Sequence, residues 1–87
     1  MYRIILEKRV VAEDIPLLPK SARSLIQKAI DTRLVSAPQH YGKPLRHSLS
    51  GHRRLGVADY RIIYRIDERD KIVYIVAIGL CRDIYEH

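Results

Sequence analysis

The sequence predicts an α+β fold: a short N-terminal strand and two helices precede an antiparallel meander of three strands. Three observations support this class. The 87 residues suffice for one domain with a modest core, and no repeat or linker divides residues 1–87. Apolar residues have helical spacing only between residues 8 and 34. After Pro44 they alternate with polar residues at the period of two that is typical of strands.

The first half of the chain is expected to form one strand, two helices and a loop. Residues 2–6 alternate as in a short strand. Residues 8–18 are weakly helical, and Pro16 predicts that this helix is short or kinked. Pro19 opens a second helix, and residues 36–44 read as a loop. The apolar residues of the second helix form one stripe, which consists of Ala22, Leu25, Ile26, Ala29, Ile30 and Leu34.

The second half is expected to form the meander, with strands at residues 52–57, 59–67 and 71–79. The charged turn at residues 67–70 suits a hairpin, and the last strand is apolar on both faces, as a covered central strand should be. In the middle strand one face is apolar and is expected in the core: Tyr60, Ile62, Tyr64 and Ile66. The opposite face carries Arg61, Ile63 and Arg65. The helices should therefore cover the tyrosine face and leave a basic face open.

Charge is the most informative feature of the composition. Sixteen lysines and arginines outnumber ten acidic residues, which gives a net charge of +6 and a pI of about 9.8. Six of these basic residues and a single acid lie between residues 43 and 65, so 23 residues carry a net charge of +5. Such a cluster favours a polyanionic partner, either nucleic acid, an acidic protein or an anionic membrane surface. Arginines at a strand period also form a platform for RNA phosphates.

Several other classes of protein are disfavoured. No apolar run reaches the roughly 18 residues that a membrane span requires, and the charges at Arg3 and Glu7 are atypical of a signal peptide. We therefore expect a cytoplasmic protein without a membrane partner. Cys81 is the single cysteine, which excludes an internal disulfide and suits a reducing cytosol. No Cys/His cluster has zinc spacing, so neither a metal nor another cofactor is expected.

Three stretches of the chain resemble the RelE/ParE toxin family when taken together. They are Gly42-Lys43-Pro44-Leu45-Arg46, Gly51-His52-Arg53-Arg54-Leu55 leading into Tyr60-Arg61-Ile62-Ile63-Tyr64, and Gly79-Leu80-Cys81-Arg82-Asp83-Ile84-Tyr85. The family reads strand, helix pair, a "K-x-L" loop, a basic strand, "Y-R-(I/L/V)-x-Y", an apolar strand and a tail near "H-R-x-D-(I/V)-Y". The resemblance covers nearly the whole chain.

The resemblance implies a toxin of a type II toxin–antitoxin system that cleaves messenger RNA, usually in the ribosomal A site. Its partners would be mRNA on the ribosome and a cognate antitoxin protein. In such cleavage the ribose 2′-hydroxyl attacks its own phosphorus, so the enzyme must orient the attack and move two protons. It must also neutralise the charge that develops on the phosphoryl oxygens, which arginines do well. This chemistry requires no cofactor.

The family's functional residues are carried over by position. Arg54 falls where the family has a strand lysine or arginine, and Arg61 follows the motif's Tyr60, so both are expected to bind phosphate and stabilise the transition state. His52 lies two residues before Arg54, where a histidine can donate or accept a proton. Tyr85 matches the terminal tyrosine, a stacking or proton-transfer group. The remaining basic residues are expected to bind RNA: Lys43, Arg46, Arg53, Arg65 and Arg82.

The chain departs from the family pattern at three positions. Cys81 occupies the place of the usual tail arginine, Leu80 that of a common histidine, and Gly56 that of another frequent arginine. Two alternatives therefore stay open. One is a ParE-like toxin that inhibits DNA gyrase without cutting RNA. The other is a catalytically degenerate toxin that only binds antitoxin or RNA.

Overall fold

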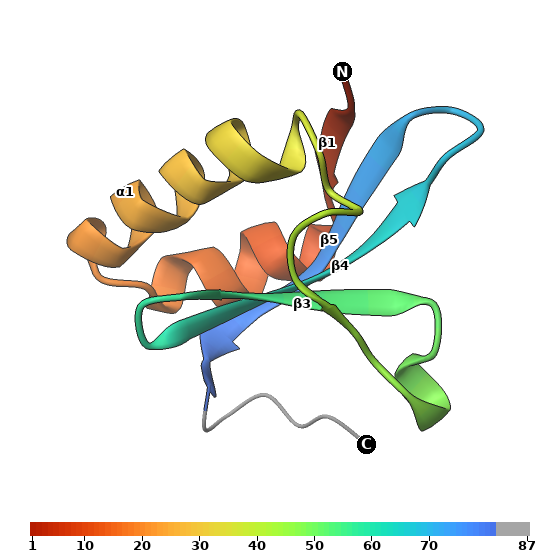
Figure 1. Ribbon diagram of the computed structural model, residues 1–87. Coiled ribbons are helices and arrows are strands. Elements are labelled where there is room, and N and C mark those ends of the chain that lie inside the picture. The colour runs from red at the N-terminus through yellow and green to blue at the C-terminus, as the bar shows by residue number, and fades with distance from the viewer. Residues whose placement is uncertain (82–87) are drawn as a thin grey trace.

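A single five-stranded sheet forms the centre of the protein, whose computed structural model describes residues 1–81 (Figure 1). The strands are β1 (Arg3–Leu6), β2 (Lys43–Pro44), β3 (His52–Val57), β4 (Tyr60–Asp67) and β5 (Ile72–Leu80). Their order across the sheet is β1-β5-β4-β3-β2. β1 runs parallel to β5, and the other pairs are antiparallel. The predicted α+β class and the three-strand meander are confirmed, and the loop predicted at residues 36–44 ends in the short strand β2.

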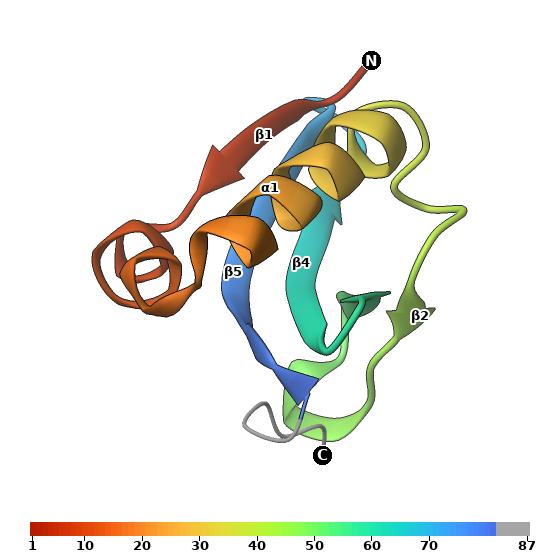
Figure 2. The same ribbon diagram turned by 90° about the vertical axis from the view of Figure 1, so that its left-hand side faces the viewer.

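Two helical segments cover one face of this sheet, as Figure 2 shows for α1 lying across β4 and β5. The first comprises a π-helical turn, η1 (Val10–Asp14), followed by a 3₁₀ turn, η2 (Ile15–Leu17). The second comprises α1 (Lys20–Ala29) and a π-helical end, η3 (Ile30–Leu34). None of the described helices has the length and apolarity needed to cross a membrane.

The two prolines explain where the helices divide. Pro16 stands at the start of η2, where a missing backbone N–H costs little. Leu18 is extended, with φ −81° and ψ 134°, because a residue before proline avoids the helical region. Pro19 then caps α1, and its carbonyl accepts the Arg23 N–H at 3.0 Å. The expectation of a short first helix and a second helix opened by Pro19 is confirmed.

The core lies between the helices and the meander. Five of the six residues expected in the stripe of the second helix are buried, namely Ala22, Ile26, Ala29, Ile30 and Leu34. They pack in one cluster with the strand residues Leu55, Val57, Ile62, Tyr64, Val73 and Ile75. Leu25 was expected in the stripe but is 50% exposed, because it projects from the flank of the helix rather than toward the sheet.

Side chains of the first helical segment hold the open edge of β5. β1 pairs only with Ile72–Ile75, so the next residues of β5 have no neighbouring strand there. Arg9 donates a 2.7 Å hydrogen bond to the Val76 carbonyl, and Asp14 accepts one of 2.9 Å from the Ile78 N–H. Arg9 and Asp14 also form an ion pair of 2.8 Å. This arrangement satisfies edge groups of β5 and fixes the helix against the sheet.

Candidate functional site

The register of the strands sets which residues share the open face of the sheet. Paired residues point to the same side, and Leu55 pairs with Ile62 in the core beneath the helices. The alternate positions therefore point away from the helices. They form three rows: Lys43, Arg54, Ile63 and Ala77; Gly56, Arg61 and Gly79; and His52, Arg65 and Tyr74. The predicted division into a core face and a basic face is confirmed.

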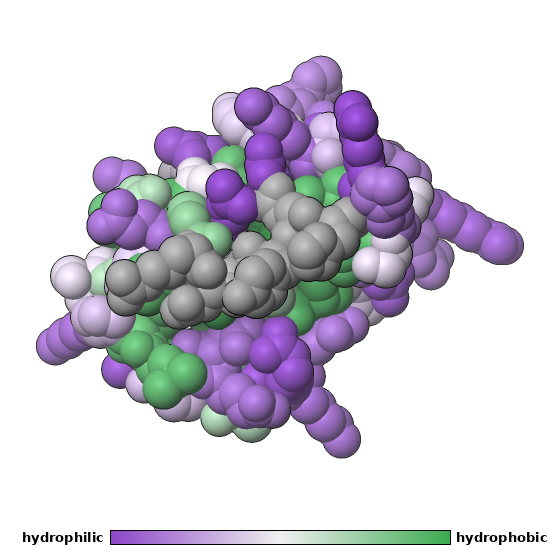
Figure 3. Space-filling model, turned by 90° about the horizontal axis from the view of Figure 1, so that it is seen from below, coloured by the Kyte–Doolittle hydropathy of each residue, from purple (hydrophilic) through white to green (hydrophobic). Residues whose placement is uncertain are grey.

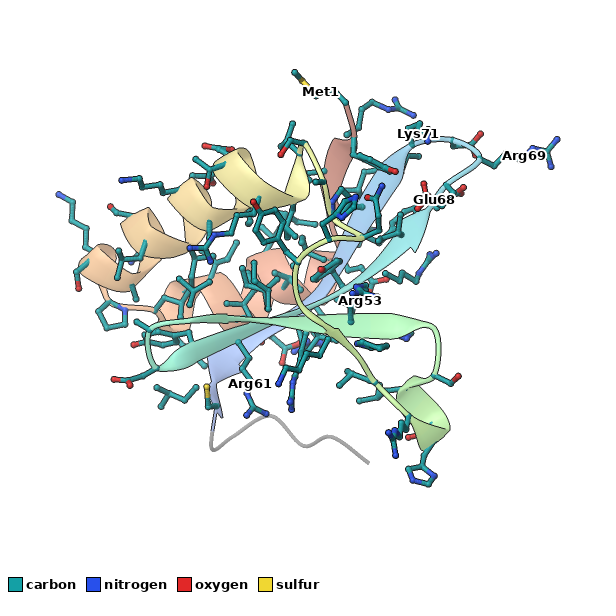
Figure 4. All side chains as sticks on the ribbon, viewed as in Figure 1. Met1, Arg53, Arg61, Glu68, Arg69 and Lys71 are labelled. Carbon is teal, nitrogen blue, oxygen red and sulfur yellow. The ribbon has the colours of Figure 1, made fainter. Side chains whose placement is uncertain are left out.

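A shallow pocket of about 380 Å³ lies on this open face. It is lined by Gly42, Lys43, Arg54, Leu55, Gly56, Arg61 and Cys81. Three cationic side chains thus reach it from three different strands, β2, β3 and β4. Figure 4 shows Arg61 directed below the sheet and away from the helices. Around the residues drawn in grey, the surface seen from below combines many hydrophilic groups with smaller hydrophobic areas (Figure 3).

Arg61 stands between two glycines in its row of the open face. Its neighbours on both adjacent strands are glycines, Gly56 on β3 and Gly79 on β5. A β-carbon built on Gly56 would meet no other atom within 4 Å. Glycines at both positions therefore place no β-carbon beside Arg61 within its row. Arg54 and Arg61 are both partly buried, which strengthens their interaction with an anion.

The Tyr64 hydroxyl holds the loop that precedes Lys43 from the core side of the sheet. The Tyr64 hydroxyl lies 2.8 Å from the Pro38 carbonyl and 2.7 Å from the Tyr41 carbonyl, and its single proton serves both acceptors. Burial raises the pKa of Tyr64 above its usual value, whereas a hydrogen bond from Arg53 acts in the opposite direction. The hydroxyl therefore stays protonated and remains a donor.

Arg53 is a second support of this loop. Its Nε donates to the Tyr41 carbonyl and its terminal nitrogen to the Gly42 carbonyl, each at 3.2 Å. Arg53 pairs with Tyr64 across the strands and so lies on the opposite face from Arg54. The structure does not bring it to the pocket with Lys43. Arg53 and Tyr64 together fix the loop end from which Lys43 projects.

His52 and Arg65 lie on the open face but outside the pocket lining. His52 is two strand positions from Arg54, and among the described residues its buried Nδ1 has no hydrogen-bond partner. Arg65 is exposed, and its guanidinium carbon lies 4.0 Å from the centroid of the Tyr74 ring. The basic face thus has two parts, the pocket and the row of His52, Arg65 and Tyr74.

The other predicted site residues have different surroundings. Arg46 is exposed in the connection between β2 and β3, where its carbonyl accepts the Leu49 N–H at 3.2 Å. Arg82 and Tyr85 lie outside the described residues. Cys81 is half-buried and lines the pocket beside the cations. Among residues 1–81, no group of three His, Cys, Asp or Glu side chains could hold a metal ion.

Two residues that shape the site were not identified from the sequence. Gly42 was noted only as part of a motif, and Tyr64 was assigned to the core without a role for its hydroxyl. A signal was present in each case. Gly42 directly precedes the loop lysine, and a tyrosine in an aliphatic core must place its hydroxyl against a partner. Which carbonyls it reaches depends on a loop more than twenty residues away in the chain.

Comparisons with known proteins identify the family of this chain. Residues 2–85 match the family described as the ParE toxin of type II toxin–antitoxin systems. The chain is 33% identical to Toxin RelE of Mycobacterium tuberculosis over 68 residues, which is 78% of this chain and 70% of that protein.

Solved structures show the same fold. The RelBE2 toxin–antitoxin complex of Mycobacterium tuberculosis matches with a TM-score of 0.84 and 26% identity over 91% of this chain and 96% of that one. The isolated RelE toxin of Escherichia coli matches with a TM-score of 0.77 and 16% identity, over 92% and 84% of the two chains. The family match, the sequence identity and the shared fold lead to the same conclusion. The chain belongs to the RelE/ParE family and is a RelE-like toxin of the type II toxin–antitoxin class.

Proposed function

We propose that this toxin is an endoribonuclease that cleaves messenger RNA in the A site of the ribosome and thereby stops translation. The observation that carries the proposal is the convergence of Lys43, Arg54 and Arg61 on one open pocket. Three cations around an accessible space attract a phosphodiester and hold it in a fixed place. Membership of the RelE/ParE family supports the same activity.

The proposed reaction uses the RNA's own nucleophile. The ribose 2′-hydroxyl attacks the adjacent phosphorus, the bond from phosphorus to the 5′-oxygen breaks, and a 2′,3′-cyclic phosphate remains. Arg54 and Arg61 stabilise the additional negative charge on the phosphoryl oxygens in the transition state. Lys43 holds the phosphate chain at the rim. Because the nucleophile is part of the substrate, the toxin's main task is orientation and charge stabilisation.

Two protons must move in this reaction, one from the 2′-hydroxyl and one to the leaving 5′-oxygen. We assign these transfers to His52 and Tyr85. His52 shares the open face with Arg54, and histidine transfers protons readily near neutral pH. Tyr85 is assigned by its match to the family's terminal tyrosine. The RNA chain on either side of the cleaved bond would contact Arg65, Arg46 and Arg82, whereas Arg53 acts through the loop that it supports.

A cognate antitoxin is the proposed protein partner. The related RelBE2 toxin of Mycobacterium tuberculosis was solved as a toxin–antitoxin complex. A neutralising segment that covers the pocket face must offset the net charge of +5 between residues 43 and 65, so we infer an acidic segment. In the complex this toxin should bind RNA more weakly than when it is free.

A second candidate function is inhibition of DNA gyrase without RNA cleavage. Two observations favour it: the matched family is described as ParE toxin, and Cys81 replaces the tail arginine. Brief induction in bacteria distinguishes the two functions. We expect labelled methionine incorporation to stop first, with new mRNA 5′ ends found by primer extension. Loss of thymidine incorporation while translation continues, without such ends, would support gyrase inhibition instead.

A further inference from the structure

A second group of side chains lies on the open face beyond the pocket. His52, Arg65 and Tyr74 are direct neighbours across β3, β4 and β5, so their side chains form one row. This row is two strand positions from the row of Arg54 and Ile63, a distance of about 7 Å along the strands. A nucleotide attached to a phosphate in the pocket can span such a distance.

Arg65 is held in a defined position by an aromatic ring rather than by an acid. Its guanidinium carbon lies 4.0 Å from the Tyr74 ring centroid, which is a close cation–π contact. Within residues 1–81, no hydrogen bond or ion pair involves the Arg65 side chain. Arg65 is exposed, whereas Tyr74 is partly buried. The outer face of the planar cation and its five N–H donors are therefore available to a ligand.

A planar cation supported by an aromatic ring suits a nucleobase better than a phosphate alone. Bases of single-stranded RNA stack on arginine planes and on aromatic rings, whereas a phosphate needs only charge and hydrogen-bond donors. The β4–β5 turn just beyond this row carries Asp67, Glu68 and Asp70 against Arg69 and Lys71, so it has no excess of positive charge to attract a further phosphate. The RNA chain should therefore end its contact with the sheet at this row.

We propose that Arg65, stacked on Tyr74 and flanked by His52, forms a base-binding subsite for a nucleotide next to the phosphate in the pocket. This inference rests on the proposed function, because it assumes RNA in the pocket. The subsite adds a contact to the base, which the phosphate ligands Arg54 and Arg61 cannot provide. The proposed subsite also predicts that RNA binding depends on the planar shape of the side chain at position 65 and not only on its charge.

The test compares two RNA oligonucleotides of equal length and charge, both with 2′-O-methyl groups that block cleavage. One carries adenine at every position, and the other has no bases. Fluorescence anisotropy should show that the wild-type toxin binds the adenine oligonucleotide about tenfold more tightly. Arg65→Lys keeps the charge but removes the plane, and should reduce this preference, measured as the ratio of the two affinities, about fivefold. Arg69→Lys, on the hairpin turn and directed away from the sheet (Figure 4), is the matched control and should change neither affinity.

Substitutions of Tyr74 give an independent reading. Tyr74→Phe keeps the ring and should keep the preference for bases, whereas Tyr74→Leu should lower it. An Arg65→Lys toxin that retains the full preference would overturn the subsite. A wild-type toxin that binds both oligonucleotides equally and still cuts mRNA would also overturn it, with the proposed function intact. Failure of the wild-type toxin to bind either oligonucleotide would overturn the subsite, whereas mRNA left uncut on ribosomes would overturn the proposed function.

Discussion

Gly42 packs so closely on Arg54 that a β-carbon at position 42 would collide with the Arg54 carbonyl oxygen. The same β-carbon would lie 2.7 Å from the Tyr64 hydroxyl oxygen, and the φ of Gly42 is +70°. A residue without a side chain is therefore required on both steric and conformational grounds. Since Lys43 follows directly and pairs with Arg54, Gly42 determines how closely two of the pocket's cations approach each other.

We predict that Gly42→Ala lowers the free energy of unfolding by about 2 kcal/mol or more, because it adds backbone strain to the steric collision. Gly56→Ala is the matched control. Its β-carbon would meet nothing within 4 Å, so we expect a change of no more than about 0.5 kcal/mol. Urea denaturation of both variants measures the difference. Equal stabilities would mean that the loop can move away from β3 at little cost.

Removal of the Tyr64 hydroxyl should destabilise the toxin by about 1–3 kcal/mol, because the Pro38 carbonyl would lose this donor and the Tyr41 carbonyl would keep only Arg53. Tyr64→Phe tests this and keeps the ring in the core. Tyr60→Phe is the control on the same strand, because the Tyr60 hydroxyl makes no hydrogen bond within residues 1–81. Urea denaturation should separate the two variants. A Tyr64→Phe toxin as stable as Tyr60→Phe would show that the loop does not depend on this hydroxyl.

Alkaline pH should weaken the folded state through the same tyrosine. Burial raises the pKa of Tyr64 above its usual 10.0, so above that pH the unfolded chain loses a proton that the folded chain keeps. The free energy of unfolding should therefore fall as the pH rises from about 9 to about 11. The fall should be smaller in Tyr64→Phe. Part of this decrease in stability should remain in the variant, because the hydrogen bond to Glu68 also raises the pKa of Tyr2. Identical pH profiles for wild type and Tyr64→Phe would contradict this reasoning.

Arg61 should affect cleavage far more than binding. If its guanidinium stabilises the transition state, Arg61→Ala should lower the cleavage rate about 100-fold or more and lower RNA affinity far less. Arg54→Ala should behave in the same way. Lys43→Ala, from the rim, should instead weaken binding slightly and lower its salt dependence by about one phosphate contact. Single-turnover cleavage on ribosomes and binding assays measure both effects. If Arg61→Ala and Arg54→Ala cut at the wild-type rate once RNA is saturating, the two arginines only bind RNA and do not stabilise the transition state.

Cys81 offers a gain-of-function test. Cys81→Arg places a fourth cation on the pocket that Lys43, Arg54 and Arg61 already line, so cleavage should become faster. Cys81→Gln has a long polar side chain without charge and is the matched control. Its cleavage rate should remain near that of the wild type. If both variants cut at the same rate, a cation at this position contributes nothing to the reaction.

The sequence by itself determined the fold class and the two faces of the meander. Tyr60, Ile62 and Tyr64 alternate with Arg61 and Arg65, and a strand must place such a series on opposite sides. Pro19 likewise determined where the second helix begins, since a proline suits that position and disrupts a helix interior. These features are local, because they depend on residues within one turn or one strand of each other.

Only the tertiary structure decided which basic residues share a site. Arg53 and Arg54 are adjacent in the chain, yet one supports a loop and the other lines the pocket. Lys43 reaches Arg54 only because β2 pairs with β3, and the sequence by itself reads this segment as loop. The contact of Arg65 with Tyr74 depends on the register of β4 with β5. Register is set by packing between distant segments, so local sequence cannot specify it.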